Sequence, residues 1–490
     1  MSSKKIINVL FLAAEADPLI KVGGLGDVAG SLPRALRELA PDLLDGYSLD
    51  VRLALPLHAT IRQKVLKSHP MGNFSIKVKG MPLPFMAIPT ELFGVPTYLI
   101  SGDLIPPDGP VYSSDPRQDG RKYFFYCMAA LELIHQMGWQ TDILHANDWH
   151  TAAAVYALAL SRDNDTFLAA TRSLMTIHNL PFMGVGSEEV LNDFNLPPSS
   201  DARIPGWARH TPLPLGLVSA DHIVAVSPGY AREILTPDYG CGLELLLYDR
   251  KNDVTGIING LDTKRWNPAT DQALLAQYSW EDLSRRQINK QSLLAEFSLN
   301  PAPDIPLIIL VSRMDPQKGV DLVSPALNSI SDLPWQAILL GTGDPFLEES
   351  IHHLQDDFPD RIRAVLRFDT NLSRRLYSGA DLLIMPSRYE PCGLSQMIAM
   401  HYGCIPVARS TGGLKDTICD DPEQRKTTGF LFNEPTHIGL ANALRRALDI
   451  YTRPIIWRDI QHRGMVQDFS WHQSALAYAN LYLDLHKRKI

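Results

Sequence analysis

The sequence predicts an α/β protein made of two doubly wound halves, each with a mainly parallel sheet. Short apolar segments of strand length recur along the 490 residues. Many of them are continuously apolar rather than alternating, which is typical of parallel strands buried on both faces. Helix-length segments lie between them, so strands and helices alternate along the chain.

The strands are expected in two series. The first comprises residues 8–13, 51–55, 97–100, 143–145, 174–178, 222–227 and 254–258. The second comprises residues 306–312, 336–340, 362–367, 382–385 and 405–409. Helices are expected between them, among others at residues 27–39, 123–137 and 372–378.

A turn-rich stretch separates the two series. Asn259-Gly260 and residues 267–270 are typical of turns, and a polar, helix-like segment at residues 280–297 follows them. We therefore expect a first domain at residues 1–255 and a second domain at residues 256–467.

Composition limits the class of protein. Hydrophobic residues make up 45% and charged residues 20%, which excludes a disordered chain, and the net charge of -8 disfavours a nucleic-acid partner. No apolar segment approaches the ~20 residues of a transmembrane helix, so no membrane partner is expected. The five cysteines are widely spaced without a CxxC pair, which disfavours a zinc site and suits a reduced, cytosolic setting. The apolar run after Lys5 is interpreted as a first strand rather than a signal peptide, because Asn8 interrupts it and Glu15 follows it.

A glycine-rich turn follows this first strand. Residues 21–27 read KVGGLGD, so Lys21, Gly23, Gly24 and Asp27 lie where a strand gives way to a helix. Glycines allow close approach of a ligand, and a helix start offers free N–H groups to an anion. A turn chosen only for its conformation explains the same residues equally well. The turn matches neither a GxGxxG fingerprint nor a P-loop, which disfavours a dinucleotide oxidoreductase.

Charged residues follow two strands of the second series. Arg313 and Lys318 lie after residues 306–312, where two cations could bind a diphosphate. Glu390 follows residues 382–385, where its carboxylate could accept hydrogen bonds from sugar hydroxyls. The alternative for Arg313 and Lys318 is a solvated loop without a ligand. The alternative for Glu390 is a carboxylate that only stabilises the N-terminus of a helix. Ligands of α/β proteins bind at the carboxyl ends of strands, which favours the functional interpretation. Cys392 has no histidine nearby and is not expected to be a nucleophile.

The first half has polar residues in equivalent places. Asp148 lies in the HANDWH segment at residues 145–150, and His178 lies at the end of residues 174–178. Asn147 and Trp149 are not typical zinc ligands, which disfavours a zinc site in this segment. A lone histidine such as His178 is more often structural than functional, and Asn259 alone indicates only a turn.

Together these segments closely resemble the bacterial glycogen synthase and plant or cyanobacterial starch synthase family over essentially the whole chain. The segments that carry the resemblance are KVGGLGDV at 21–28, DWH at 148–150, HN at 178–179, SPGYAREI at 227–234, NGLD at 259–262, SRMDPQKG at 312–319, EPCGLSQ at 390–396, TGGLKD at 411–416 and DFSW at 468–471.

The resemblance implies the GT-B architecture, which has two Rossmann-like domains and a cleft between them. In that family the last helix crosses back onto the N-terminal domain, which corresponds here to residues 468–490. The implied reaction is transfer of glucose from ADP-glucose to the 4-hydroxyl at the non-reducing end of an α-1,4-glucan, with retention of configuration and no metal or cofactor. The implied location is the cytoplasm, or the plastid stroma in a plastid-bearing source; no transit peptide is seen.

The resemblance also implies roles for individual residues. Arg313 and Lys318 would hold the diphosphate, Glu390 would bind the 3- and 4-hydroxyls of the donor glucose, and His178 and Asp148 would lie near the reacting centre. The implied donor-binding residues are Lys21, Gly23, Gly24, Asp27, Asn259 near the 6-hydroxyl, Phe368 near the adenine, Thr411, and Gly412 and Gly413 through their N–H groups.

Three segments depart from the family pattern: residues 408–414, ARSTGGL, in the second domain, and two segments in the first domain. The family's HN-(L/I)-A-(Y/H)-Q-G is here residues 178–184, HNLPFMG, and a usual lysine is missing from residues 211–216, TPLPLG. Both lie where the acceptor is expected, which leaves acceptor identity open. A related transferase using UDP-glucose or a small acceptor, and a catalytically weak glucan-binding protein, remain alternatives.

Overall fold

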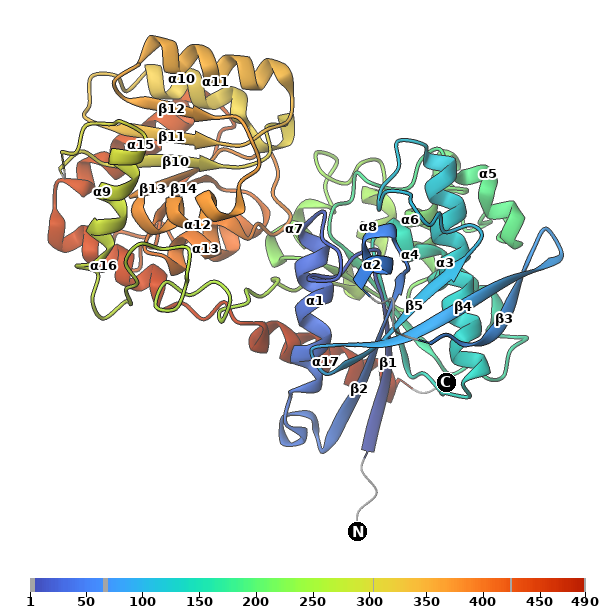
Figure 1. The fold of residues 1–490 in the computed structure, drawn as a ribbon. Coiled ribbons are helices and arrows are strands. Elements are labelled where there is room, and N and C mark those ends of the chain that lie inside the picture. Colours follow the sequence, from blue (N-terminus) through green and yellow to red (C-terminus); the bar gives the residue numbers. More distant parts are fainter. Residues whose placement is uncertain (1–4, 65–68, 303, 424, 489–490) are drawn as a thin grey trace. The chain divides into compact units, whose positions relative to one another are not determined.

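The computed structural model describes residues 5–64, 69–302, 304–423 and 425–488. Internal contacts divide the chain into two units, which are drawn in Figure 1. Unit 1 comprises residues 1–260 and 471–490, and unit 2 comprises residues 261–470. The sequence-based boundaries were expected at residues 255 and 467.

Unit 1 is built on one nine-stranded sheet with the order β3-β4-β5-β2-β1-β6-β7-β8-β9. The pairs from β5 through β2 and β1 to β9 are parallel, and Val9 of β1 lies opposite both Val51 of β2 and Ile143 of β6. Its strands are β1 Lys5–Leu12, β2 Tyr47–Pro56, β3 Met71–Val78, β4 Met81–Leu92, β5 Val95–Gly102, β6 Ile143–Asn147, β7 Arg172–Ile177, β8 His222–Ala225 and β9 Val254–Gly256. Its helices are α1 Gly24–Arg37, α2 Ala59–Lys64, α3 Pro116–Gln136, α4 Trp149–Ser161, α5 Glu188–Leu191, α6 Pro212–Ser219, α7 Pro228–Glu233, α8 Glu244–Asp249 and α17 Trp471–Lys487.

Unit 2 is built on a parallel six-stranded sheet with the order β12-β11-β10-β13-β14-β15. The first strand of the unit, β10, lies in the middle of the sheet. The strand order runs outward from it in both directions, to β12 on one side and to β15 on the other, as in doubly wound dinucleotide-binding folds. Its strands are β10 Leu307–Val311, β11 Gln336–Leu340, β12 Ile362–Val365, β13 Leu382–Met385, β14 Ile405–Arg409 and β15 Phe430–Phe432. Its helices are α9 Arg286–Glu296, α10 Val323–Asn328, α11 Pro345–Asp357, α12 Thr370–Gly379, α13 Ser395–His401, α14 Gly412–Thr417, α15 His437–Tyr451 and α16 Pro454–Met465.

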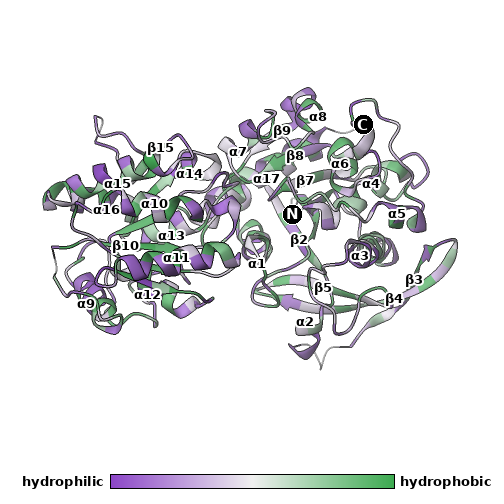
Figure 2. Ribbon diagram, turned by 90° about the horizontal axis from the view of Figure 1, so that it is seen from above, coloured by the Kyte–Doolittle hydropathy of each residue, from purple (hydrophilic) through white to green (hydrophobic). Residues whose placement is uncertain are grey.

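The unit 2 sheet is buried on both faces. Ile308 and Leu310 of β10 belong to one core cluster with α10 and α15, whereas Leu307 and Ile309 belong to a second cluster with α9 and α12. Figure 2 shows helices in which hydrophobic and hydrophilic residues alternate along the ribbon, as helices that cover a sheet on one side require. Continuously apolar strands thus arise because alternate side chains enter opposite cores.

The predicted fold class, two parallel-rich α/β sheets, is confirmed. Every expected strand is present, three of them with the expected bounds and the others with shifted ends. The sequence analysis missed the antiparallel β3–β4 hairpin at the edge of the unit 1 sheet (Figure 1), together with β15. β3 and β4 are partly exposed, and β4 contains three prolines, so neither has a continuous apolar run. The helix-like segment expected at residues 280–297 is helical only in α9.

The C-terminal helix α17 contacts the rest of unit 1 through buried polar groups. The hydroxyl of Tyr482 lies 2.6 Å from Nδ1 of His145 on β6, and Oγ of Ser474 donates to the carbonyl of Ile258 at 2.6 Å. His145 is fully buried, so these contacts replace water that the ring would otherwise need. The helix is therefore fixed to the same sheet as β1.

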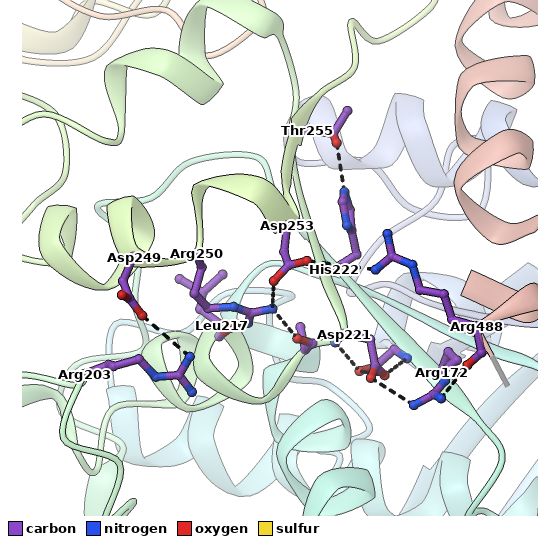
Figure 3. A network of polar contacts seen from close by, with 12 residues as sticks. Arg172, Arg203, Leu217, Asp221, His222, Asp249, Arg250, Asp253, Thr255 and Arg488 are labelled. Carbon is purple, nitrogen blue, oxygen red and sulfur yellow. Dashed lines mark hydrogen bonds and ion pairs between the residues drawn. The ribbon is translucent and has the colours of Figure 1, made fainter. Parts of the chain in front are cut away.

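A polar network attaches the chain after α17 to the sheet (Figure 3). Arg172 donates to the carbonyl of Arg488 at 2.6 Å and lies 3.4 Å from the carboxylate of Asp221. The guanidinium of Arg488 lies 4.0 Å from Asp253, which also pairs with Arg250. These contacts join α17 to the amino ends of β7, β8 and β9, at the edge opposite the functional loops described below.

Candidate active site

In each unit, functional candidates cluster where the strand order reverses. In unit 2 this point lies between β10 and β13, and in unit 1 between β1 and β6. Helices connect to opposite faces of the sheet on the two sides of such a point, which leaves space for a ligand at the carboxyl ends of the strands. The segments that leave β10, β13, β1 and β6 carry Lys318, Glu390, Lys21 and Asp148, respectively.

Lys318 and Glu390 form the centre of the unit 2 cluster. Nζ of Lys318 lies 2.9 Å and 2.8 Å from the two carboxylate oxygens of Glu390, which is only 5% exposed. The hydroxyl of Ser387 donates to the same carboxylate at 2.8 Å. Both charged groups are thereby held in place, with the lysine partly open to solvent and able to contact an anion.

Arg313 and Asp315 flank this pair. The carboxylate of Asp315 accepts the N–H of Lys318 at 3.0 Å and so fixes the single turn Pro316–Lys318. Arg313 pairs with Asp315 at 2.9 Å, but its side chain is 68% exposed. Such an exposed pair contributes little to stability, so the guanidinium is free to exchange partners.

The TGGLKD segment packs closely on the Glu390 loop. The N–H of Gly413 donates to the carbonyl of Glu390 at 3.0 Å, and a Cβ at Gly413 would lie 2.1 Å from the carbonyl oxygen of Cys392. The glycine allows α14 to touch the segment that carries Glu390. The donor contact that the resemblance implies for the Gly413 N–H stays a prediction. Gly412 has φ of +44°, and Thr411 is fully buried.

Phe368 stands apart from the other unit 2 candidates. It lies between β12 and α12, next to Asp369, whose carboxylate caps α12 by accepting the N–H of Leu372 at 2.9 Å. The Phe368 ring is 86% exposed. An exposed aromatic ring fixed beside a helix cap is available to stack on a flat ligand.

The glycine-rich loop of unit 1, residues 21–27, binds a carboxylate from the same chain. The carboxylate of Glu15 accepts the N–H groups of Val22 and Gly23, the latter at 3.1 Å. The donor contact that the resemblance implies for the Gly23-Gly24 turn stays a prediction. Gly24 is the first residue of α1, and no atom lies within 4 Å of the position that a Cβ would take there. Its N–H cannot be satisfied inside the helix.

Lys21 and Asp27 lie on the same loop. Nζ of Lys21 is 2.6 Å from a carboxylate oxygen of Asp27, and the lysine side chain is 39% exposed. The pair is surface-accessible, so a ligand phosphate could compete with Asp27 for the lysine. Asp27 also lies in the first turn of α1, where the helix dipole favours a negative charge.

Asp148 is a buried carboxylate with an unusual backbone. It has φ of +56°, and it accepts the backbone N–H of His178 at 2.7 Å. Burial raises the pKa of Asp148 to about 7, against the lowering effect of the N–H donors of His178 and Asn179 and with a further rise from the charge of Glu15. Asp148 can therefore exist in either protonation state near neutral pH.

His178 is held by Asn147. Nε2 of the imidazole lies 2.9 Å from Oδ1 of Asn147, whose Nδ2 donates to the carbonyl of Leu12 at 2.9 Å. Burial lowers the pKa of His178 to about 3, so the ring is neutral at physiological pH. With the Asn147 carbonyl as acceptor, Nε2 carries the proton. His178 thus joins Asp148 in one cluster rather than standing alone.

Asn259 lies after β9 at the same edge. It is 6% exposed, and within the described part of the chain its Oδ1 has no hydrogen-bond partner. A buried acceptor without a donor is costly, which favours a ligand donor at this position. The sequence alone indicated only a turn here.

Sequence reasoning missed several residues of the two clusters. Glu15 was used only as an argument against a signal peptide, although it follows β1 at the carboxyl edge, a signal that could have identified it. Tyr112, whose hydroxyl donates to Glu15 at 3.1 Å, carries no motif of its own. Ser387 and Asn147 were seen only as neighbours of stronger candidates.

The two departures from the family pattern in unit 1 are adjacent in space. The N–H of Leu213 donates to the carbonyl of Met183 at 3.2 Å, which joins the start of α6 to the segment after His178. Phe182 in that segment is 58% exposed. The two altered segments therefore touch, although the start of α6 is buried and Phe182 is exposed.

The described residues contain no group of three or more His, Cys, Asp or Glu side chains placed to hold a metal ion. Likewise, no helix in the described ranges is long and apolar enough to cross a membrane.

Comparisons with known proteins assign the family. Residues 8–249 match the starch synthase catalytic domain, and residues 294–456 match glycosyl transferases group 1. The chain is 39% identical to a glycogen synthase of Anaeromyxobacter sp. over 98% of this chain and 99% of that one. It is 36% identical to a glycogen synthase of Geotalea daltonii over 97% of this chain and 98% of that one.

Solved structures agree with these matches. The catalytic domain of starch synthase IV from Arabidopsis thaliana, bound to ADP and acarbose, is 31% identical, with a TM-score of 0.85 over 99% of this chain and 100% of that one. A sucrose-phosphate synthase from Thermosynechococcus elongatus, 21% identical with a TM-score of 0.59, shares the fold. With its two Rossmann-like α/β units and its full-length similarity to these enzymes, the chain belongs to the glycogen synthase and starch synthase family of GT-B glycosyltransferases.

Proposed function

We propose that this protein elongates an α-1,4-glucan at its non-reducing end by transferring glucose from ADP-glucose with retention of configuration. The observation that carries the proposal is the Lys318–Glu390 pair at the strand reversal of unit 2, within a chain that matches glycogen synthases over its full length. The ADP in the Arabidopsis complex supports an adenine nucleotide donor. The cytoplasm is the proposed location.

Leaving-group stabilisation is the first part of the mechanism. As the bond between C1 of glucose and the phosphate oxygen breaks, negative charge grows on the departing ADP. Lys318 Nζ and the exposed Arg313 guanidinium are placed at the carboxyl edge of the sheet to neutralise it. Removing one such preorganised group typically costs ~10²–10³ in rate.

Positioning is the second part. The acceptor 4-hydroxyl attacks C1 on the face that the leaving group departs from, and its proton passes to a phosphate oxygen, so the new glycosidic bond keeps the old configuration. Glu390, held by Lys318 and Ser387, orients the glucose hydroxyls. The neutral His178 and the buried Asp148 are proposed to lie near the transferred glucose.

Donor-binding roles are proposed for residues in each unit. In unit 1 these residues are Lys21, Gly23, Gly24, Asp27 and Asn259. In unit 2, Phe368 is proposed to lie against the adenine, and Thr411, Gly412 and Gly413 are proposed to lie beside the phosphates or the sugar.

One experiment separates the donor and acceptor alternatives. We expect nucleotide release with ADP-glucose and glycogen, little release with UDP-glucose, and chain extension of maltooligosaccharides detected by chromatography. Turnover with UDP-glucose alone would refute the ADP-glucose assignment. Glycogen binding without turnover would instead support a glucan-binding protein.

The altered segments bear on the choice of acceptor. Residues 181–183, which follow His178 in the chain and include the exposed Phe182, contact the buried start of α6. Turnover on a short oligosaccharide but not on glycogen would indicate that residues 181–183 select a small acceptor.

A further inference from the structure

Glu15 is a buried carboxylate that the proposed reaction has not yet used. It follows β1 by three residues and is fully buried, with 0% exposure. Among the described residues, no lysine, arginine or histidine forms an ion pair with it. An unpaired buried charge is costly unless several hydrogen bonds satisfy it.

Three donors satisfy this carboxylate. The N–H groups of Val22 and Gly23 and the hydroxyl of Tyr112 all point at it, the last two at 3.1 Å. Hydrogen bonds to a charged acceptor are roughly twice as strong as neutral ones. The start of α1 adds the favourable end of a helix dipole.

The glycine spacing makes room for this arrangement. A Cβ at Gly26 would lie 3.2 Å from Oε2 of Glu15 and 3.1 Å from Cγ of Lys21, and a Cβ at Gly23 would lie 3.4 Å from Oε1. Gly24, between them, has no atom within 4 Å of that position. Gly26 is therefore constrained by the chain itself, whereas the space at Gly24 is left for another molecule.

Tyr112 is held by a second buried pair. Nζ of Lys122 donates to the carbonyl of Val111 at 2.6 Å and pairs with Asp119 at 2.7 Å, and Asp119 accepts the N–H of Ser113 at 2.9 Å. Burial, followed by the charge of Glu15, raises the pKa of Tyr112 well above its ordinary value. The hydroxyl therefore remains protonated and remains a donor to Glu15.

We infer that Glu15 is a positioning residue for the donor: its carboxylate occupies the Val22 and Gly23 N–H groups and locks the loop so that Lys21 and the Gly24 N–H face the nucleotide. This inference rests on the proposed function. A loop held in its binding conformation loses less entropy when the donor arrives, so donor affinity depends on Glu15 although the residue does not touch the donor.

The test is E15Q, which keeps the shape but removes the charge and one acceptor oxygen. We expect the KM for ADP-glucose and the Kd for ADP, measured by calorimetry, each to rise about tenfold or more. The KM for glycogen should stay within twofold, because the inference assigns this loop to the donor alone. E38Q, an exposed glutamate directly after α1 that pairs with Arg34, is the matched control and should leave all three constants unchanged.

Two results would overturn the inference. One is folded E15Q with a donor KM and an ADP Kd within twofold of the wild type. The other is an equal rise in donor and acceptor KM, which indicates a general structural role. If E15Q does not fold, Y112F, which removes a single donor, should still raise the donor KM two- to fivefold, and an unchanged value would refute the role. A wild-type chain without glucose transfer refutes the proposed function instead.

Discussion

At the scale of single residues, the structure shows that the key charges work as pairs. Lys318 and Glu390 satisfy each other across the strand reversal, and Ser387 completes the group. A substitution of one partner therefore alters the other as well, and its effects on rate and on stability need to be measured separately.

For this pair we expect K318A and E390Q each to lower kcat by about 10²-fold or more, because each removes charge or orientation at the leaving group. E390Q keeps the side-chain volume, so the free energy of unfolding should fall by no more than about 1–3 kcal/mol. Steady-state kinetics and urea unfolding measure the two effects, with E349Q on exposed α11 as the control. Near-normal kcat in both variants would contradict the site assignment.

Asp148 predicts an unusual dependence of stability on pH. Its pKa is about 7 in the folded state against 3.8 for an ordinary aspartate, so between these two pH values the folded protein binds one proton more than the unfolded chain. Stability from this group is therefore complete below about pH 4 and falls as the pH rises to about 7, by on the order of 4 kcal/mol at about 1.4 kcal/mol per unit.

D148N does not titrate and should remove this decline. Urea unfolding at pH 4.5, 6 and 8 should show a gap between variant and wild type that widens with pH, in favour of the variant. D163N, an exposed aspartate beyond α4, should follow the wild-type curve. Parallel curves for D148N and the wild type would contradict the raised pKa of Asp148.

At the scale of elements, helices α1 and α14 begin with similar glycine-containing sequences but differ in their surroundings. Helix α1 opens into free space at Gly24, whereas α14 at Gly413 touches the carbonyl of Cys392. The first glycine is thus available to a ligand, and the second is required for packing.

Alanine at these two positions should separate the roles. G24A should leave the melting temperature unchanged or slightly higher, because alanine favours a helix by roughly 1 kcal/mol over glycine, but should raise the donor KM several-fold. G413A should lower stability by roughly 1–3 kcal/mol through overpacking. Thermal unfolding and donor titration measure both, with G206A, another open position, as control. An unchanged donor KM in G24A would refute donor contact at the α1 N-terminus.

At the scale of the whole molecule, each unit has its own sheet, and α17 returns the C-terminal segment to unit 1. A ligand that binds only the folded state stabilises it in proportion to its concentration. The diphosphate residues proposed here predict that ADP acts on the unfolding transition of unit 2.

ADP at about a hundredfold its Kd should stabilise the protein by about 2.7 kcal/mol, seen by scanning calorimetry as an upward shift of one transition. K318A should lose most of that shift, whereas K426A, at an exposed lysine in the same unit, should keep it. An equal shift in both variants would place the nucleotide elsewhere.

The sequence by itself determined the fold class, the order of elements and the positions of most candidate residues. Buried parallel strands are continuously apolar, and the motifs follow the ends of these strands, so local pattern was sufficient. The exposed, proline-containing β3–β4 hairpin left no such pattern and was missed.

Only the tertiary structure decided which groups are partners. The spacing of residues along the chain does not show that Glu15 fills the glycine loop, that Gly413 donates to Glu390, or that Asn147 orients His178. These contacts depend on how the loops fold, and two of them join different strand-to-helix segments. Burial sets the protonation of Asp148 and His178. The physical reason is that desolvation and hydrogen bonding depend on neighbours in space, which the order of residues does not contain.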